Sequence, residues 1–558
     1  MKGQKFIPLL VVAAGLLAYH NSFTGPFIFD DIRSIPKNPT IRHLWPIWRP
    51  LSPPPTAGVG GRPIVNFSLA INYAFGGTAV QGYHAMNLAI HILAGLTLLG
   101  IVRRTLQQPR LRERFGPAAN ELALAVAVLW TVHPLQTESV TYVSQRAESL
   151  MGLFYLLTLY CFIRGTESAR KDSWHDLCLG ACVLGMATKE VMVSAPLMVM
   201  LYDRTFVSGS FREAWRRHQT LYLALASTWL LLGYLMSGVH IRGVGYGLGV
   251  TWWAYALTEC RSIVHYLWLA VWPHSLVFDY GTNTVMRHVA DAAPSALILL
   301  LLVAGVVIGL KRWPAIGFVG AWFFVILAPS SSVVPVANQP MAENRMYLPL
   351  AAVVVTLAMG IYASAGRRSL PVFFALALGL GFLTTQRNED YRSQVSIWSD
   401  TVAKQPENAR AHNNLGNALA ADGRLPEAIG HLDQALRLKP NYAEAHNNLG
   451  LALVRLGRLQ EAMAHWELAL QSKPDYAEAH NNLGNGLLNL GKLQEAAWHF
   501  EQALLLEPDY AEAHYNLGLA LEQTGRIPEA ISHYEQALRS KPGYAGAQQR
   551  LERLRTVH

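Results

Sequence analysis

The chain has 558 residues, of which 51% are hydrophobic and only 15% charged, with a formal net charge of +9. This charged fraction lies far below the soluble average of about 25%, which excludes a water-soluble protein over the whole length. Residues 1–386 contain long apolar runs, whereas residues 387–558 have the polar composition of a soluble domain. The basic residues cluster between apolar runs, so the positive charge does not indicate a nucleic-acid partner.

The first apolar run extends from Phe6 to Ala18 and follows Lys2 and Lys5. This pattern also resembles a signal peptide. However, no small-x-small cleavage site closes the run, and many more apolar runs follow it. We therefore expect an uncleaved first membrane helix.

Runs that approach the roughly 20 residues of a membrane helix recur through the first 386 residues. They predict an all-α fold whose first domain, residues 1–386, is a polytopic bundle. The eleven predicted spans are 6–23, 83–102, 118–132, 148–163, 175–188, 190–203, 219–237, 293–310, 314–329, 346–364 and 370–386. The runs 175–188 and 190–203 are short, and a broken pair is the alternative to two full spans. The aromatic, amphipathic stretch 251–277 forms either one more hairpin or helices at the membrane interface.

The placement of Arg and Lys predicts the orientation. Basic clusters occupy alternate loops, at 103–114, 164–171, 204–217, 311–312 and 367–368. By the positive-inside rule these loops are cytoplasmic, and the N-terminus lies on the same side. An odd number of spans then places everything after residue 386 outside the cytoplasm.

The polar third of the chain repeats with a period of 34 residues. Proline marks each period, at 406, 440, 474, 508 and 542, and strings such as HNNLGNALAADGRLPEAIGHLDQAL recur between them. A 34-residue helix–turn–helix unit with these Gly, Ala and Pro positions is the tetratricopeptide (TPR) signature. We expect a connector at 387–408, an α-solenoid of four TPRs at 409–544, and a capping helix or tail at 545–558.

Two polar positions recur with the repeat. The first is held by His412, His446, His480 and His514. It is a packing position between paired helices, so we expect packing rather than a metal site. The second is held by Asn414, Asn448, Asn482 and Asn516. Such residues either hydrogen-bond an extended peptide or are solvated residues of the concave face.

Ionisable residues gather in the predicted outer loops. Asp30 and Asp31 directly follow the first helix, where two carboxylates beside a bilayer are costly without a purpose. They suit a general base or a metal ligand, the alternative being a helix cap or a solvated turn. His84, Asn87 and His91 share one face of the second span. The other loops contribute Arg62, His133, Glu138, Arg146, Lys189, Glu343 and Arg345, and together they predict a polar site at the outer interface.

The order of motifs resembles a known family. The strings FDD, RPIVNFSLAINYAFGG, GYHAMNLAIHIL, HPLQTESVTYVSQRAESL, TKEV and AENRMYLPL precede the repeats. This order resembles that of the transmembrane-and-TPR O-mannosyltransferases and their bacterial relatives, which are integral-membrane glycosyltransferases of the GT-C type. The resemblance covers nearly the whole chain. It implies transfer of a mannose-like hexose from a polyprenyl-phosphate donor to a protein hydroxyl outside the cytoplasm, in a bacterial inner membrane, with the TPRs docking the acceptor or a partner.

The resemblance also implies roles. An acidic pair in the first outer loop serves as base or acceptor-binding element, here Asp30 and Asp31, and which of them is the base stays open. We expect Arg146 and Arg345 to hold the donor phosphate, the alternative being Arg side chains that extend to the membrane interface. The second-tier candidates are Arg62, His84, Asn87, His91, His133, Glu138, Lys189 and Glu343. No cofactor is implied, and without a DxD motif a divalent metal is not expected.

Two other functions stay open. A non-catalytic envelope scaffold would use the TPRs to assemble proteins, although eleven spans exceed what an anchor needs. An O-antigen ligase or polymerase would also use polyprenyl-linked sugars. That class depends on a large outer loop with Arg and His, whereas here an acidic pair follows the first helix directly.

Overall fold

The structure is a computed structural model that describes residues 6–54, 57–237, 250–331, 336 and 339–557. The regular elements within these residues are all helices, which confirms the all-α prediction. The contacts divide the chain into two compact units, Met1–Lys404 and Gln405–His558. Each unit is described by itself.

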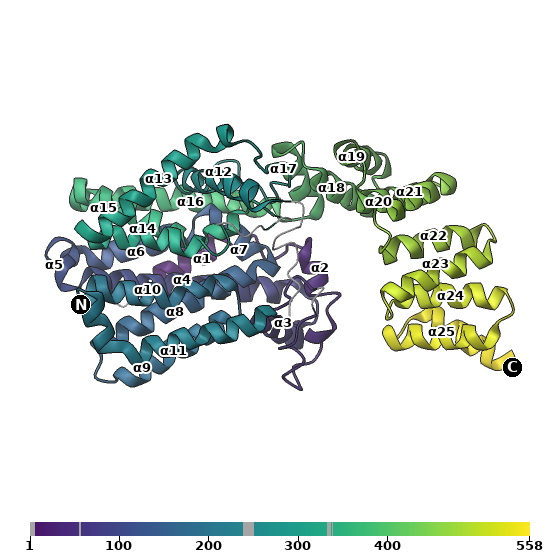
Figure 1. Ribbon diagram of the computed structural model, residues 1–558, viewed down its shortest axis with the longest axis horizontal. Coiled ribbons are helices and arrows are strands. Elements are labelled where there is room, and N and C mark those ends of the chain that lie inside the picture. The colour runs from purple at the N-terminus through teal and green to yellow at the C-terminus, as the bar shows by residue number, and fades with distance from the viewer. Residues whose placement is uncertain (1–5, 55–56, 238–249, 332–335, 337–338, 558) are drawn as a thin grey trace. The chain divides into compact units, whose positions relative to one another are not determined.

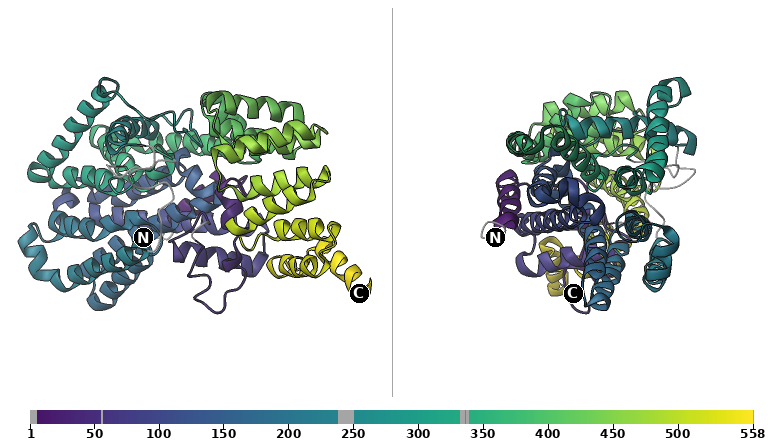
Figure 2. Two further views of the ribbon diagram at one scale, coloured as in Figure 1. Left: turned by 45° about the vertical axis from the view of Figure 1, so that its right-hand side comes forward. Right: turned by 90° about the vertical axis from the view of Figure 1, so that its left-hand side faces the viewer.

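The first unit is a bundle of apolar helices. They are α1 (Ile7–Ala18), α4 (Val80–Leu106), α6 (Ala119–Thr131), α8 (Arg146–Glu167), α9 (Lys171–Met186), α10 (Ala195–Tyr202), α11 (Phe211–Ser237), α12 (Trp252–Val271), α13 (Val289–Arg312), α14 (Pro314–Leu327), α15 (Leu350–Ala365) and α16 (Leu370–Asp390). Each predicted span coincides with one of these helices, and α12 occupies the stretch whose crossing was left open. α4, α6 and α8 lie side by side (Figures 1 and 2).

Length and composition identify which helices can cross a bilayer. Five helical stretches in the described residues qualify, or six if the bent pair Pro109–Thr131 and Pro134–Thr141 forms one span. α1 and α14 are apolar but shorter. The chain is therefore a membrane protein, while eleven crossings remain a prediction.

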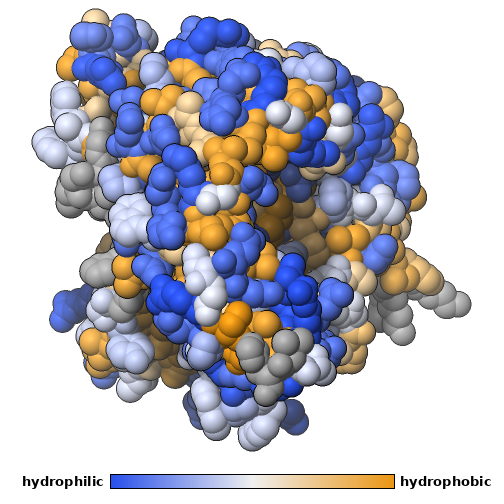
Figure 3. All heavy atoms as spheres, turned by 90° about the vertical axis from the view of Figure 1, so that its right-hand side faces the viewer, coloured by the Kyte–Doolittle hydropathy of each residue, from blue (hydrophilic) through white to orange (hydrophobic). Residues whose placement is uncertain are grey.

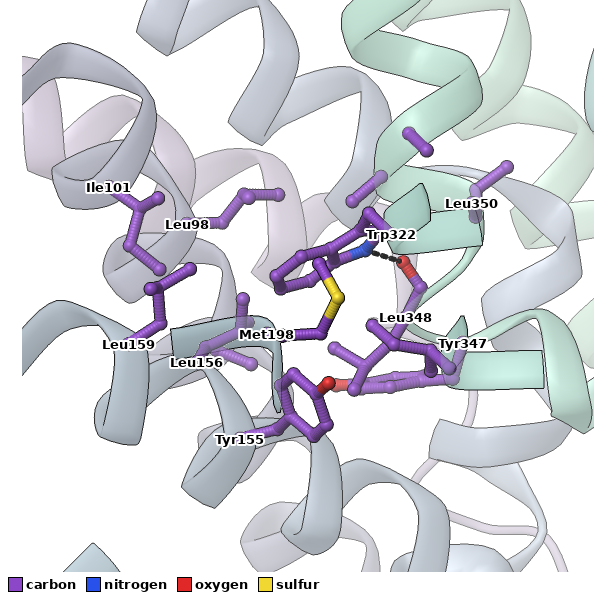
Figure 4. Packing of buried hydrophobic residues seen from close by; sticks show 14 of the residues in the cluster. Leu98, Ile101, Tyr155, Leu156, Leu159, Met198, Trp322, Tyr347, Leu348 and Leu350 are labelled. Carbon is purple, nitrogen blue, oxygen red and sulfur yellow. Dashed lines mark hydrogen bonds between the residues drawn. The ribbon is translucent and has the colours of Figure 1, made fainter. Parts of the chain in front are cut away.

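Large apolar side chains fill the centre of this bundle. Met198, Trp322 and Leu348 meet there from three segments, and the indole N–H of Trp322 donates to the Leu348 carbonyl at 3.0 Å (Figure 4). Burial of such side chains is the main source of stability for the packed interior. By contrast α13 buries only Ala292 and Gly309, as expected of a helix that faces lipid.

Short helices lie between the apolar helices and carry most of the polar loop residues. They are α2 (Asp30–Ser34), η2 (Pro39–Ile41), α3 (Pro63–Gly76), α5 (Pro109–Phe115), η3 (Gly116–Ala118), η4 (Pro134–Gln136), α7 (Thr137–Thr141), η5 (Val143–Gln145), η6 (Glu190–Ser194), η7 (Asp203–Val207), η8 (Glu343–Met346) and η9 (Gly366–Ser369). Pro134 shows how the sequence sets such a break. Its ring cannot continue α6, and the His133 ring accepts from the Leu135 N–H at 3.2 Å to start η4.

The segment expected as a connector contains a helix, α17 (Gln394–Lys404), which packs on the first unit. Trp398 on α17 is buried, and Asp400 accepts from the Arg387 guanidinium at 2.7 Å. Lys404 donates to the Leu276 carbonyl at 2.8 Å. These contacts make α17 part of the membrane unit.

The second unit is a stack of helix pairs. It comprises α18 (Ala409–Ala421), α19 (Leu425–Leu438), α20 (Ala443–Arg455), α21 (Leu459–Ser472), α22 (Ala477–Asn489), α23 (Leu493–Leu506), α24 (Ala511–Gln523), α25 (Ile527–Ser540) and α26 (Ala545–Val557). Gly450 shows why glycine recurs in the inner helices, because an added Cβ would lie 2.5 Å from the Trp466 indole nitrogen. The unit has its own apolar core. The face of the chain drawn in Figure 3 carries both hydrophilic and apolar side chains.

Candidate functional site

The carboxyl group of Asp31 is fully buried at the start of α2. It accepts hydrogen bonds from the Ser144 N–H at 2.6 Å and from the Ile28 N–H at 3.2 Å. Burial raises the pKa of Asp31 to about 7, although these two N–H groups act in the opposite direction. Asp31 therefore joins the first loop to η5, directly before α8.

Asp30 differs from its neighbour because its side chain is half-buried. Its backbone N–H donates to the Tyr142 hydroxyl at 3.0 Å. The preceding residue, Phe29, has φ 44° and ψ −111°, a conformation that L-residues rarely adopt. Gly58 packs against α2, where an added Cβ would collide with the Ser34 hydroxyl and lie 3.2 Å from the Asp30 Cβ. The turn at Asp30 is thus strained and closely enclosed, as functional turns often are.

An aromatic wall stands beside this turn. Its members, drawn from five separate segments, are Phe29, Tyr142, Phe278, Tyr391 and Trp398. The Phe29 ring meets the Trp398 ring edge-on at a centroid distance of 5.6 Å. Only Phe29 is exposed, at 38%, while the other four are buried. The wall holds the Phe29 turn in place and presents one open aromatic face next to Asp30.

Arg146 is fully buried, and its guanidinium is occupied by internal acceptors. It donates to the Asn87 side-chain oxygen at 2.6 Å, to the Ser68 carbonyl at 3.1 Å and to the Tyr83 carbonyl at 3.0 Å. These partners lie on α3 and α4, so Arg146 joins three helices. This geometry suits a framework role better than the phosphate-binding role expected from the sequence.

The three predicted histidines are also buried and internally bonded. His84 pairs with the Gly25 carbonyl at 2.9 Å, and His133 with the Ala270 carbonyl at 3.2 Å. His91 lies between the Tyr347 hydroxyl and the Thr131 carbonyl, each at 2.9 Å. They connect segments that are distant in sequence, and none is exposed for a substrate.

Glu138 and Glu343 form a second buried acidic group. Glu138 accepts from the Asn344 N–H at 3.1 Å, and Glu343 accepts from the Val277 N–H and the Tyr280 hydroxyl, each at 2.7 Å. Burial raises the pKa of Glu343, opposed by the positive charge of Arg387. Arg387 is a residue that sequence reasoning missed, as it stands at the polar end of the last apolar run.

Three of the predicted cations lie near the N-terminal end of α8, and each is paired with a glutamate. Lys189 forms an ion pair with Glu148, Arg345 pairs with Glu259 at 2.8 Å, and Arg62 lies 3.9 Å from Glu190. Arg62 approaches Glu190, the residue next to Lys189, and Glu148 and Arg345 line the same crevice. We call Arg62, Lys189 and Arg345 the cation cluster. Glu259 had no sequence signal beyond its place in an aromatic helix.

A narrow crevice opens beside the cation cluster. Its walls are formed by Glu148, Met151, Val191, Ile326, Ser330, Arg345, Leu348 and Pro349. One acid, Glu148, and one base, Arg345, face this crevice, which is otherwise mostly apolar and has no room for a water molecule. Among the described residues no group of three or more His, Cys, Asp or Glu is arranged to hold a metal ion.

The predicted asparagine ladder makes bonds within the repeat unit. The side-chain amides of Asn448, Asn482 and Asn516 donate at 2.9, 2.8 and 2.9 Å to Asn413, Asn447 and Asn481 of the preceding repeat. Asn414 has no preceding repeat, and its Nδ2 is buried without a partner in the described structure. The ladder therefore joins the repeats to one another.

Each predicted histidine of the repeats pairs with a second histidine that sequence reasoning missed. The pairs are His412–His431, His446–His465, His480–His499 and His514–His533, each with Nδ1 atoms 3.0 Å apart. The second histidines also recur every 34 residues, so the period itself was the available signal. The histidines between paired helices therefore form hydrogen bonds with each other within each repeat.

Comparison with known protein families defines the class of the second unit. The family described as "Tetratricopeptide repeat" matches residues 481–545, and the one described as "TPR repeat" matches residues 416–457 and 452–491. Among solved structures, the crystal structure of MamA is 25% identical, with a TM-score of 0.25, and covers 29% of this chain and 93% of that chain. That of YrrB, a TPR protein with an unusual peptide-binding site, is 23% identical, with a TM-score of 0.26, over 31% of this chain and 89% of that chain.

Curated relatives extend the similarity over most of the chain. Protein O-mannosyl-transferase Tmtc3 of Drosophila melanogaster is 26% identical over 77% of this chain and 55% of its own length. Protein O-mannosyl-transferase F38B6.6 of Caenorhabditis elegans is 24% identical over 77% of this chain and 62% of its own length. Protein O-mannosyl-transferase TMTC4 of Homo sapiens is 27% identical over 75% of this chain and 65% of its own length. The resemblance drawn from the motifs is confirmed, and the chain spans less than two thirds of each of these relatives.

Proposed function

We propose that this chain is an integral-membrane glycosyltransferase that moves a mannose-like hexose from a polyprenyl-phosphate donor to a protein hydroxyl. One observation carries the proposal: a half-buried carboxyl group, Asp30, and the cation cluster both lie where α8 begins. Asp31 bonds Ser144 just before α8, and Glu148, which pairs with Lys189, lies one helical turn further on. The names of the curated relatives support mannose and a protein acceptor.

Asp30 is the base in this proposal, and Asp31 is a positioning residue. Asp31 is fully buried with both oxygens bonded to backbone N–H groups, whereas the Asp30 side chain reaches the surface. The acceptor hydroxyl gives its proton to Asp30 as its oxygen attacks the anomeric carbon. The bond from that carbon to the donor phosphate breaks, and polyprenyl phosphate leaves.

The cation cluster binds the leaving phosphate. Arg can hold phosphate oxygens bidentately, and cations aimed at a departing anion stabilise its developing charge. The crevice has to widen to accept the isoprenoid chain next to the phosphate, along its apolar wall of Met151, Val191 and Ile326. Each cation has a carboxylate partner, and the Arg345 guanidinium also donates to the Gln339 and Pro340 carbonyls. The donor phosphate therefore has to displace these internal acceptors.

The reaction takes place on the non-cytoplasmic face, and the TPRs lie on that face too. The alternating basic loops support this orientation by the positive-inside rule. The TPRs dock the protein acceptor. Leu451 and Val454, exposed at 42% and 39% on α20, offer it apolar contacts beside the asparagine ladder.

A transfer assay tests the proposal. Membranes containing the wild-type chain are incubated with radiolabelled polyprenyl-phosphate mannose, and protein-bound label is measured. We expect Asp30→Asn to lower transfer by about 10²- to 10⁴-fold, which is the usual contribution of a general base. Glu113→Gln, an exposed acid on α5, is the matched control with unchanged transfer. Full activity of Asp30→Asn would overturn the base assignment, and no transfer by the wild type would favour a scaffold.

A further inference from the structure

A stretch of the first loop exposes large apolar side chains in succession. Within residues 43–49, which we call the aromatic tip, Leu44, Trp45, Ile47 and Trp48 are exposed at 36, 76, 43 and 65%. The dark purple segment between α2 and α3 extends away from the helices in Figures 1 and 2. Contiguous apolar exposure of this kind marks an interaction surface.

The base of the aromatic tip is held rigidly. Asn66 is fully buried, and its Nδ2 donates to the Pro50 carbonyl at 2.7 Å and to the Thr40 hydroxyl at 2.9 Å, on the two sides of the tip. Asn38 is buried beside it and donates to the Asn66 oxygen at 2.8 Å. Ile41 is fully buried in the core beneath. The exposed Trp side chains thus stand on a fixed frame.

The sequence around the aromatic tip is basic. No Asp or Glu occurs from residue 32 to residue 112. The loop up to α3 carries Arg33, Lys37, Arg42, Arg49 and Arg62. Arg33, Lys37 and Arg49 are exposed, while the Arg42 guanidinium lies 4.5 Å above the Tyr73 ring. This concentration of positive charge favours an anionic partner.

We propose that the aromatic tip inserts into the interface of the surrounding bilayer, where the exposed basic residues bind anionic phospholipid head groups. Trp is the residue that most favours the level of the head groups, and Arg or Lys next to it adds attraction to anionic lipid. The tip belongs to a loop that joins two apolar helices, α1 and α4, which keeps it close to the bilayer surface. The proposal does not depend on transferase activity.

Depth-dependent quenching in liposomes tests the insertion. The full chain with Trp45→Cys in a Cys260→Ser background carries an environment-sensitive fluorophore, since the other cysteines are buried. Vesicles contain phosphatidylcholine alone or with phosphatidylglycerol, each with a spin label high on the acyl chain. We expect the spin label to quench the fluorophore at position 45, and to quench it more strongly when phosphatidylglycerol is present. The same fluorophore on Asp422→Cys, in an exposed turn of the repeat unit, should not be quenched.

A second variant separates the lipid charge from the insertion. Lys37→Gln with Arg49→Gln removes two exposed cations, and we expect quenching to persist while its increase with phosphatidylglycerol disappears. Absence of quenching in both lipid mixtures would overturn the proposal. A pyrene label at position 45 that forms excimers without lipid quenching would show that a second copy covers the tip, which would also overturn it.

Discussion

The carboxyl group of Asp31 accepts a 2.6 Å hydrogen bond from the backbone N–H of Ser144, across 113 positions of sequence. This bond attaches the first loop to the segment that begins α8. The side chain of Asp30, the preceding residue, is half-buried. Two adjacent aspartates therefore have different environments, and their substitutions are expected to differ in kind.

The first prediction concerns the pH dependence contributed by Asp31. Its pKa is raised to about 7 in the folded chain, so the protonated form is favoured there. Its contribution to stability is full below the unfolded pKa and is lost as the pH rises through about 7. We expect the wild-type Tm in detergent to fall more between about pH 5.5 and about pH 8 than that of Asp31→Asn. Equal slopes for the two proteins would contradict the buried environment of Asp31.

The second prediction concerns the close approach of Gly58. Gly58→Ala forces the Ser34 hydroxyl, α2 or the loop to move, because the new methyl group would collide with that hydroxyl and lie close to Asp30. We expect a loss of about 1–3 kcal/mol in the free energy of unfolding, as for other overpacked sites. Gly360→Ala on α15 is the matched control, since its Cβ would meet nothing within 4 Å. Chemical unfolding in detergent measures both, and a neutral Gly58→Ala would show that the loop is free to shift.

The third prediction concerns the ion pair between Lys189 and Glu148, whose side chains are 10 and 3% exposed. Glu148→Gln leaves a buried ammonium group without its charge partner, which typically costs about 3–5 kcal/mol. We expect Glu148→Gln with Lys189→Met to recover part of that loss in a double-mutant cycle. The pair Arg424–Glu427, exposed at 49 and 56%, should show a coupling below about 1 kcal/mol. A comparable coupling in both pairs would argue against burial as the cause.

The fourth prediction concerns the histidine pairs of the repeats. The Nε2 of His412 bonds the Pro406 carbonyl, so it carries the proton and leaves Nδ1 to accept from His431. Burial lowers the pKa of both rings, and that of His499 falls to about 4. A lowered histidine pKa stabilises the fold above the unfolded value of about 6.5, and this stability is lost as the pH falls below it.

Hydrogen exchange of the full chain measures this effect. After correction for intrinsic rates, we expect peptides from residues 409–544 to lose protection between about pH 7.5 and about pH 5.5. Nearby carboxylates, such as Glu427 beside His431 and Glu461 beside His465, moderate the loss. Replacement of His431, His465, His499 and His533 by Gln should flatten the response. An unchanged response would assign the pH dependence to other groups.

The repeat unit and the positions of the apolar helices could be predicted from sequence because both depend on local periodicity. The 34-residue period determines the helix pairs, and each apolar run became a helix. The second histidine of each pair recurs with the same period, so His431 could have been found from its recurrence in the following repeats. Local patterns of this kind predict helices even when the tertiary contacts are not known.

The site could be predicted only in part, because side-chain partners depend on tertiary packing. The motifs pointed to Arg62, Lys189 and Arg345, and the structure pairs each of them with a glutamate. Nothing in the sequence shows that the Arg146 guanidinium faces neutral acceptors on α3 and α4. The contact of Trp398 with Phe29 joins residues more than 360 positions apart, beyond the reach of any spacing rule.

The packing of α17 decides where the chain can be cut. A truncation after residue 386, at the end of the last apolar run, would remove Asp400 and Trp398 along with the repeats. It would leave Phe278 uncovered and remove Arg387 itself, which supplies positive charge near Glu343. A fragment that ends at Lys404 keeps all of these contacts. Comparison of the full chain with a fragment that ends at Lys404 can therefore separate what the repeats contribute from damage to the membrane unit.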